Sequence, residues 1–271
     1  MYDFKDITAG PVVTDISSVA VSIDDNKLDL VIPHYRTLNV LGRDLIGRSL
    51  STIENVPGRD GIIVVGQTLP ARTLTIEYKI EAPSNEEMRR SFDMLNQELF
   101  RRTGEVYKIH FDDDPDYYFE GYLGQAPDPP SDTNSIYGTF TLVCPTPWKT
   151  KYEVLSTTGQ GSVQFILSPG DFNVYPMYID SIELNVSADI NKIVITNTTS
   201  GRKIIINGEY TTGQVIKLSP DTGILTRNGQ NIKNNLDYLE SDWHGFSIYY
   251  GDQITVSPTM EIILNTRARL L

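Results

Sequence analysis

The residue types best suited to catalysis or metal binding are few and lie far apart. The chain has three histidines and one cysteine (His34, His110, His244 and Cys144). None has another of these residues at the spacing of a zinc motif, and no GxSxG, Walker A or GxGxxG sequence is present. Such isolated residues are mostly packing or surface residues. We therefore expect no catalytic residue, no cofactor site and no metal site, in a protein that is not an enzyme.

An acidic run at residues 112–116 is the best alternative candidate for a cation site. Its aspartates alternate as they do in a calcium-binding loop. An EF-hand loop starting at Asp112 would need Gly at position 117 and Glu at position 123, where this chain has Tyr117 and Leu123. We therefore expect the solvated tip of a β-hairpin, and a weak calcium site remains the alternative.

Aromatic residues gather near the end of the chain, and aromatic rings can stack on sugars. The cluster comprises Tyr238, Trp243, Phe246, Tyr249 and Tyr250. Such residues also fill the core of any β-sandwich. We favour core packing, with a carbohydrate site as the alternative.

The overall composition restricts the function further. The net charge of −12 argues against a protein that grips nucleic acid, since phosphate binding needs clustered cations. One cysteine allows no intrachain disulfide. The first residues are polar and acidic, so we expect no secretory signal. The apolar runs, such as residues 62–65, are far shorter than the roughly 20 residues that span a bilayer, so we expect no membrane insertion.

The first half of the chain combines short strands with one helix. Alternating apolar residues predict a hairpin from residues 19–23 and 28–32, and further strands at 73–80, 106–111, 117–123 and 136–144. Ser84 and Glu87 form a capping box before an apolar face made of Met88, Phe92, Leu95 and Leu99. With Arg101 and Arg102 in the last turn and Gly104 as the stop, residues 85–102 are expected to form an amphipathic helix on a sheet.

The second half is almost entirely β in pattern. Residues 145–150 break the pattern and mark a boundary between domains at residues 1–150 and 151–271. Strands are expected at 181–186, 192–195, 202–206, 214–218, 223–226, 253–256 and 260–264, with type I′ turns at residues 207–208 and 228–229. This number of short strands predicts a β-sandwich.

Several stretches in this order resemble one family, the distal tail proteins (Dit) of siphophages that infect Gram-positive bacteria. The first is Pro57-Gly58-Arg59-Asp60-Gly61, and the others are residues 69–76, the amphipathic helix, residues 109–119, residues 138–145 and Trp148. Residues 175–179 and 228–232 resemble the galectin-like C-terminal domain of that family. The Pro-Gly that the family has near its end is replaced here by Tyr250-Gly251.

The resemblance implies a mainly β protein. Its N-terminal domain would be a β-sandwich or split barrel with one helix and a β-hairpin arm, and its C-terminal domain a galectin-like β-sandwich. It also implies a ring, six copies in the family, that joins the phage tail tube to the tail-tip baseplate and lets DNA through. Tube, tape-measure and tail-tip (Tal-type) proteins would be its partners. The protein would be assembled in the host cytoplasm and would reside in the virion.

Residues 41–60 alternate too loosely to belong to a core sheet, and they contain apolar residues and three glycines. We expect them to form an arm that embraces a neighbouring copy, with Leu45, Ile46, Leu50 and Ile53 at the interface. The competing function is a carbohydrate-binding module that contacts the host wall through residues 151–271.

Overall fold

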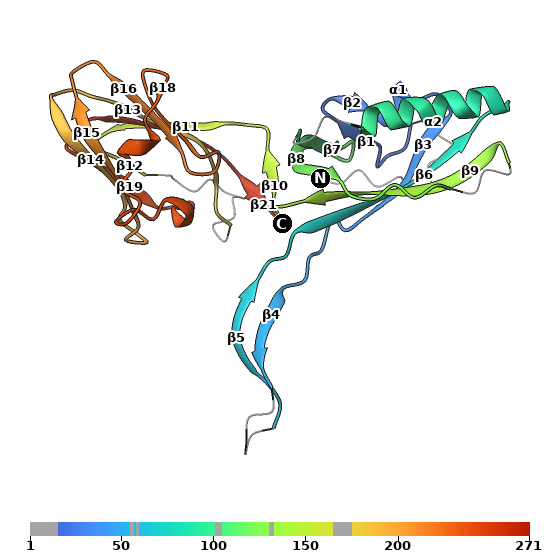
Figure 1. Cartoon of the computed structure of the whole chain (residues 1–271), viewed down its shortest axis with the longest axis horizontal. Helices are drawn as coiled ribbons and strands as arrows, with labels where there is room; N and C mark the ends of the chain where they lie inside the picture. The colour runs from blue at the N-terminus through green and yellow to red at the C-terminus, as the bar shows by residue number, and fades with distance from the viewer. Residues whose placement is uncertain (1–15, 55–56, 58–59, 101–104, 130–132, 165–174) are drawn as a thin grey trace. The chain divides into compact units, whose positions relative to one another are not determined.

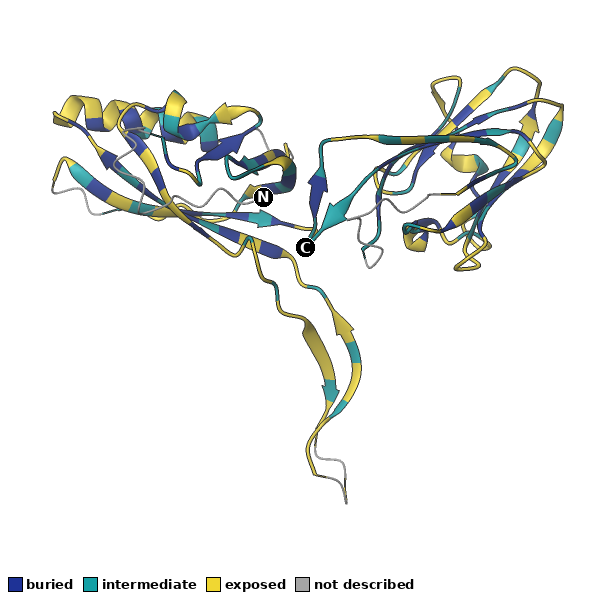
Figure 2. Ribbon diagram, turned by 180° about the vertical axis from the view of Figure 1, so that it is seen from behind, coloured by how far each residue is buried: buried dark blue, intermediate teal, exposed yellow. Residues whose placement is uncertain are grey.

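The computed structural model describes residues 16–54, 57, 60–100, 105–129, 133–164 and 175–271. It is mainly β, as expected from the sequence. The chain divides into two compact units, Met1–Lys149 with Leu271, and Thr150–Leu270. Each has its own hydrophobic core, as the dark blue segments in Figure 2 show.

The first unit is built on one sheet that runs in the order β2-β1-β7-β8-β9-β6-β3. Its strands are β1 (Val21–Ile23), β2 (Asn26–Lys27), β3 (Tyr35–Leu41), β6 (Arg72–Glu81), β7 (Tyr107–Phe111), β8 (Asp114–Leu123) and β9 (Ser135–Cys144). The predicted alternation in β6 is confirmed, because Leu74, Ile76, Tyr78 and Ile80 are all buried. Strands β6 and β9 pair along their whole length.

Helix α2 (Asn85–Leu99) covers one face of this sheet (Figure 1). Ser84 caps it as predicted, since its hydroxyl accepts the backbone N–H of Glu87 at 3.2 Å. Met88, Leu95 and Leu99 are buried, but Phe92 is only partly buried. Ser91 is buried instead, because its hydroxyl donates to the carbonyl of Pro33 at 2.7 Å.

The predicted end of this helix differs from the observed one. The helix stops at Leu99, and Phe100 has an extended backbone. Arg101, Arg102 and Gly104, which were expected to complete and stop the helix, lie outside the described residues.

The prediction that residues 28–32 form the second strand of the first hairpin is wrong. Strand β2 ends at Lys27, and residues 28–31 form the short helix α1 (Leu28–Val31). A strand would bury Leu30 on the same face as Leu28 and Ile32, whereas the helical turn buries only Leu28 and Ile32. The turn also lets the carboxylate of Asp29 accept the backbone N–H of Thr37 at 3.0 Å.

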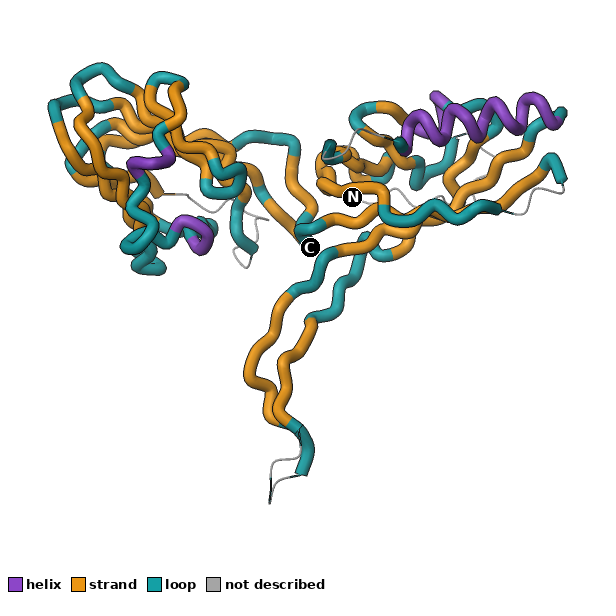
Figure 3. The backbone as a smooth tube through the Cα atoms, viewed as in Figure 1, coloured by secondary structure: helices purple, strands orange, loops and turns teal. Residues whose placement is uncertain are grey.

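The second unit contains two sheets, ordered β11-β20-β13-β16-β17-β18 and β12-β19-β14-β15 (Figure 3). The strands of the first are β11 (Leu155–Gln160), β13 (Tyr178–Asn185), β16 (Val215–Ser219), β17 (Ile224–Arg227), β18 (Gln230–Asn231) and β20 (Glu261–Arg267). Those of the second are β12 (Ser162–Gln164), β14 (Ile190–Asn197), β15 (Lys203–Tyr210) and β19 (Gln253–Ser257). Short 3₁₀ turns η1 (Lys233–Asn235) and η2 (Trp243–Gly245) lie between β18 and β19, and β10 (Lys149–Lys151) pairs with β21 (Arg269–Leu270).

Only one of the two predicted Asn-Gly turns is a turn. Asn228 and Gly229 both have positive φ and join β17 to β18 in a two-residue turn, as expected. Gly208 instead lies within β15, next to a shift in the register between β14 and β15. The Asn-Gly pair there accommodates a β-bulge, which also uses the unusual φ that glycine tolerates.

Leu95 is the better probe of how much α2 stabilises the first unit. We expect Leu95→Ala to lower the free energy of unfolding by about 2–5 kcal/mol, because the side chain is buried in the core cluster. Phe92→Ala should cost clearly less, since the ring is only partly buried. Urea unfolding of both variants measures the difference, and equal losses would contradict this placement of the helix.

The second unit should fold without the first, because its two sheets enclose a core drawn entirely from residues 163–264. We expect a fragment of residues 150–271 to show a β-type circular dichroism spectrum and a cooperative thermal transition. A fragment with a disordered spectrum would refute an independent domain.

Candidate assembly site: the hairpin arm and its anchor

Strands β4 (Ser49–Ile53) and β5 (Ile63–Thr68) form a separate two-stranded antiparallel sheet. We call residues 44–69 the arm. None of its described residues belongs to either core cluster. Figure 2 shows that most of this hairpin is exposed.

The four residues proposed for the inter-subunit contact all lie in the first half of the arm. Leu50 and Ile53 are exposed on β4. Leu45 precedes that strand and is 91% exposed, and Ile46 is partly exposed.

The motif carried over from the resemblance falls between the two strands. Pro57 is exposed, and Asp60 and Gly61 lead into β5, with a φ of +84° at Gly61. Gly58 and Arg59 lie outside the described residues.

The second strand of the arm was missed in the sequence, where the arm was expected to end at residue 60. Residues 62–65 are consecutive apolar, β-branched residues, and Ile62, Val64 and Val65 are about half exposed in the structure. Such a run usually marks a buried strand. The missed signal is the absence of charge, since neither β4 nor β5 contains a charged residue.

An exposed hairpin whose two strands carry no charge needs a partner. Natural proteins protect exposed strand edges with charged residues, proline or short strands, because unprotected edges pair with other chains. Contiguous exposed apolar residues likewise mark interaction surfaces. A two-stranded hairpin is also marginally stable by itself in water. The arm therefore has the properties of an interface.

Arg43 anchors the base of the arm to the first unit. Its guanidinium donates two hydrogen bonds to the carboxylate of Asp113, one of them 2.6 Å long. It also lies over the ring of Phe111, 5.2 Å from the centroid. Both charged side chains are largely buried. A planar bidentate contact of this kind fixes the direction of the chain as well as its position.

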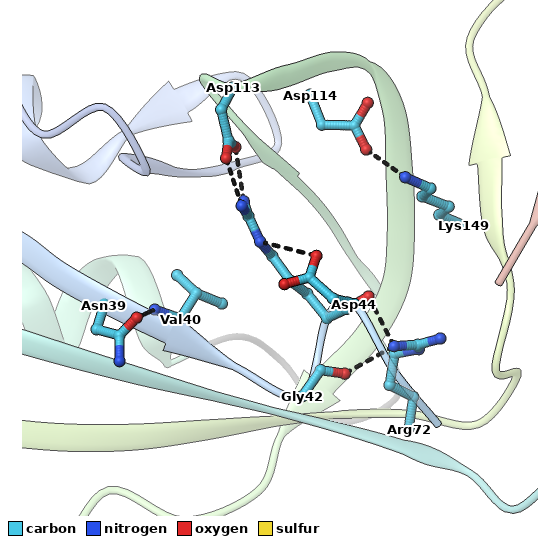
Figure 4. Close-up of polar contacts among 9 residues, drawn as sticks. Asn39, Val40, Gly42, Asp44, Arg72, Asp113, Asp114 and Lys149 are labelled. Atoms are coloured by element: carbon cyan, nitrogen blue, oxygen red, sulfur yellow. Dashed lines mark hydrogen bonds and ion pairs between the residues drawn. The ribbon is translucent and has the colours of Figure 1, made fainter. Parts of the chain in front are cut away.

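Arg72 holds the other side of the base. Its side chain is 2% exposed, and one terminal nitrogen donates to the carbonyl oxygens of Gly42 and Arg43, each at 2.7 Å. Its Nε donates to the carbonyl of Pro147 at 2.9 Å, and Figure 4 shows Arg72 beside Gly42. Burial lowers the pKa of Arg72, and electrostatic interactions with Cys144 and Asp44 oppose this in part. The guanidinium also lies 5.3 Å from the centroid of the Phe119 ring.

Gly42 is required where the chain leaves the sheet. Its φ is +85°, and a Cβ atom there would lie 2.1 Å from the carbonyl oxygen of Thr73. No other residue could occupy this position without moving the backbone.

The acidic turn forms ion pairs within the first unit, which corrects the expectation of a solvated tip. Asp112 pairs with Lys27 at 2.7 Å, Asp113 with Arg43, and Asp114 with Lys149 at 2.6 Å. The three carboxylates therefore serve three different cations. Among the described residues, no group of three or more His, Cys, Asp or Glu side chains could hold a metal ion.

The isolated histidines and the cysteine have the surroundings of packing or surface residues. His34 lies 2.9 Å from a carboxylate oxygen of Glu87, and His244 is exposed. Cys144 is buried in β9, and burial raises the pKa of its thiol to about 12. A thiol with that pKa is a poor nucleophile.

The aromatic residues of the second unit mostly pack in its core. Trp243 and Phe246 are buried, and Tyr250 is partly buried against the same core cluster. The two buried rings are not available to stack on a sugar. Tyr238 is exposed, next to Leu239, which is 98% exposed.

Comparison with known proteins identifies the family. A model of a phage tail protein RIFT-related domain matches residues 34–144. A model of the C-terminal domain of a siphovirus-type tail component matches residues 169–266. No curated protein sequence matches the chain significantly.

Solved structures have the same fold. The Dit protein (gp 19.1) of phage SPP1, described as a paradigm of hub adsorption apparatus in phages that infect Gram-positive bacteria, superposes with a TM-score of 0.72. It is 17% identical, and the match covers 93% of this chain and 100% of that one. A chain of the phage P2 baseplate, in its activated conformation with Ca, matches with a TM-score of 0.50 and 10% identity, over 87% of this chain and 91% of that one.

The two matched domains define a phage tail component, located in the virion. The chain belongs to the siphophage distal tail protein family. No helix in the described part of the chain has the length and apolar character to cross a bilayer.

Breaking the anchor at Asp113 should destabilise the first unit. We expect Arg43→Ala or Asp113→Ala to cost about 3 kcal/mol, because each leaves a largely buried charge unpaired. The double variant should cost clearly less than the sum, and urea unfolding of all three measures this coupling. Lys27→Ala is the matched control, since its ion pair is more exposed and should contribute under about 1 kcal/mol. Additive losses would show that the pair does not act as an anchor.

Proposed function

We propose that this chain is a non-enzymatic structural subunit that assembles through its arm into a closed ring. The observation that carries the proposal is an exposed hairpin with uncharged, partly apolar strands, fixed at its base by Arg43 and Arg72. A rigid base is what an assembling arm needs, because it lowers the ordering cost of binding.

The arm makes a head-to-tail contact the natural mode of association. A surface that differs from the one it binds repeats from copy to copy and closes into a ring when the rotation allows. A stable contact buries on the order of 1,000 Å² or more in total. A two-stranded arm with six half-exposed or more exposed apolar side chains (Leu45, Leu50, Ile53, Ile62, Val64 and Val65) can supply much of that area.

The similarity to a hub protein and to a baseplate chain supports a place for this ring at the tip of the tail. We infer six copies, which connect the tail tube to the tail-tip baseplate and contact tube, tape-measure and Tal-type proteins. DNA would pass through the lumen. A net charge of −12 suits this role, because a wall of the same sign as DNA offers few contacts to phosphate.

Removal of the arm should abolish the ring and leave a folded monomer. The variant replaces residues 45–69 by a short Gly-Ser linker and retains Arg43 and Arg72. We expect light scattering to give the wild-type protein six times the mass of one chain, which is 30.4 kDa. The variant should have the mass of one chain.

Point substitutions test whether the ring depends on the arm itself and not on exposed apolar residues in general. Leu50→Asp with Val64→Asp should also give monomers, since a charge would be buried at the contact. Leu239→Asp, on an even more exposed apolar residue of the second unit, should leave the ring intact. A ring that persists without the arm would refute the proposal.

A further inference from the structure

The two faces of the arm differ between its inner and outer halves. Cross-strand partners share a face, and successive residues alternate between faces. In the inner half, Leu50 is paired with Gln67 on one face, and the other face carries only small polar residues and glycine: Ser49 with Thr68 and Ser51 with Gly66. The inner half is therefore apolar on one side at most.

The outer half is apolar on both faces. Thr52 is paired with Val64 on the face of Leu50, and Ile53 is paired with Ile63 on the opposite face. Val64 and Ile53, on opposite faces, are 51% and 50% exposed. The change coincides with a register shift between Ser51 and Thr52, where Val65 is the additional residue of a β-bulge. A strand with both faces apolar is typical of a buried position between two layers.

The reach of the arm fits such a position. From Asp44 to Ile53 an extended chain at about 3.3 Å per residue covers roughly 30 Å. A compact body of about 124 residues, the size of the first unit without its arm, has a radius of gyration near 14 Å and so a width of about 35 Å. The outer half can therefore reach across most of a neighbouring first unit.

We propose that the outer half of the arm is inserted between two further copies of this chain, whereas the inner half lies on the surface of the first of them. This rests on the proposed ring, in which each copy has a neighbour and a next neighbour along the same direction. The face of Leu50 and Val64 contacts the adjacent copy, and the face of Ile53 contacts the copy beyond it. The small polar face of Ser49 and Ser51 remains in solvent.

Photo-crosslinking at single positions tests this arrangement. Tagged chains that carry Val64→benzoylphenylalanine, Ile53→benzoylphenylalanine or both are co-expressed with a large excess of unmodified chain, so that each ring contains at most one modified copy. We expect dimers from each single variant and trimers from the double variant. Ser51→benzoylphenylalanine is the matched control, on the same strand and face as Ile53, and should crosslink at least ten-fold less than Ile53 does.

The outcomes distinguish this inference from the proposed ring. Dimers without trimers from the two single variants and the double variant would show that one neighbour encloses both faces of the outer half. That result would overturn the contact with the copy beyond it. Crosslinks at Val64 but not at Ile53 would show that the outer half lies on a surface, with the ring itself intact. If neither position crosslinks and the wild-type mass is that of one chain, the ring fails and this inference fails with it.

Discussion

The contacts at the base of the arm set the direction of the hairpin on which the proposed assembly depends. The two uncharged strands have no core of their own, so their direction must come from the residues where the chain leaves the sheet. There the buried guanidinium of Arg72 binds the carbonyls of Gly42 and Arg43, and Arg43 binds Asp113. These contacts use fixed bidentate geometry, which restrains the chain more than a flexible ammonium group would.

The acidic turn supplies part of this anchor. Its alternating aspartates looked like candidate calcium ligands, but Asp112, Asp113 and Asp114 each pair with a cation from a different part of the first unit. Asp112 holds the β2 end through Lys27, Asp113 holds the arm, and Asp114 holds Lys149 at the end of the unit. A short hairpin tip thus fastens three distant segments to β7 and β8. The excess of acid over base in this unit is partly structural for that reason.

Local patterns could be predicted from the sequence, and long-range partners could not. The alternation of β6 and the cap of α2 depend on neighbouring residues, and both were correct. The strand expected at residues 28–32 failed because the contacts of Asp29 with Thr37 decide the local structure. Arg43 and Arg72 were not recognised as anchor residues, since their partners lie 29 or more positions away in the sequence. The second strand of the arm was missed because a short apolar run is equally typical of a strand buried within its own domain.

The composition of the arm reflects two opposing requirements. Before assembly, the exposed, uncharged strands of the arm favour aggregation, and the net charge of −12 on the whole chain opposes this by repulsion between copies. Within an assembly, a charge on β4 or β5 would lose its hydration and destabilise the contact. Charge is therefore excluded from the two strands and kept on the rest of the surface. Because Coulombic repulsion is screened beyond about 8–10 Å at physiological salt, the short-range apolar contact can prevail once the copies meet.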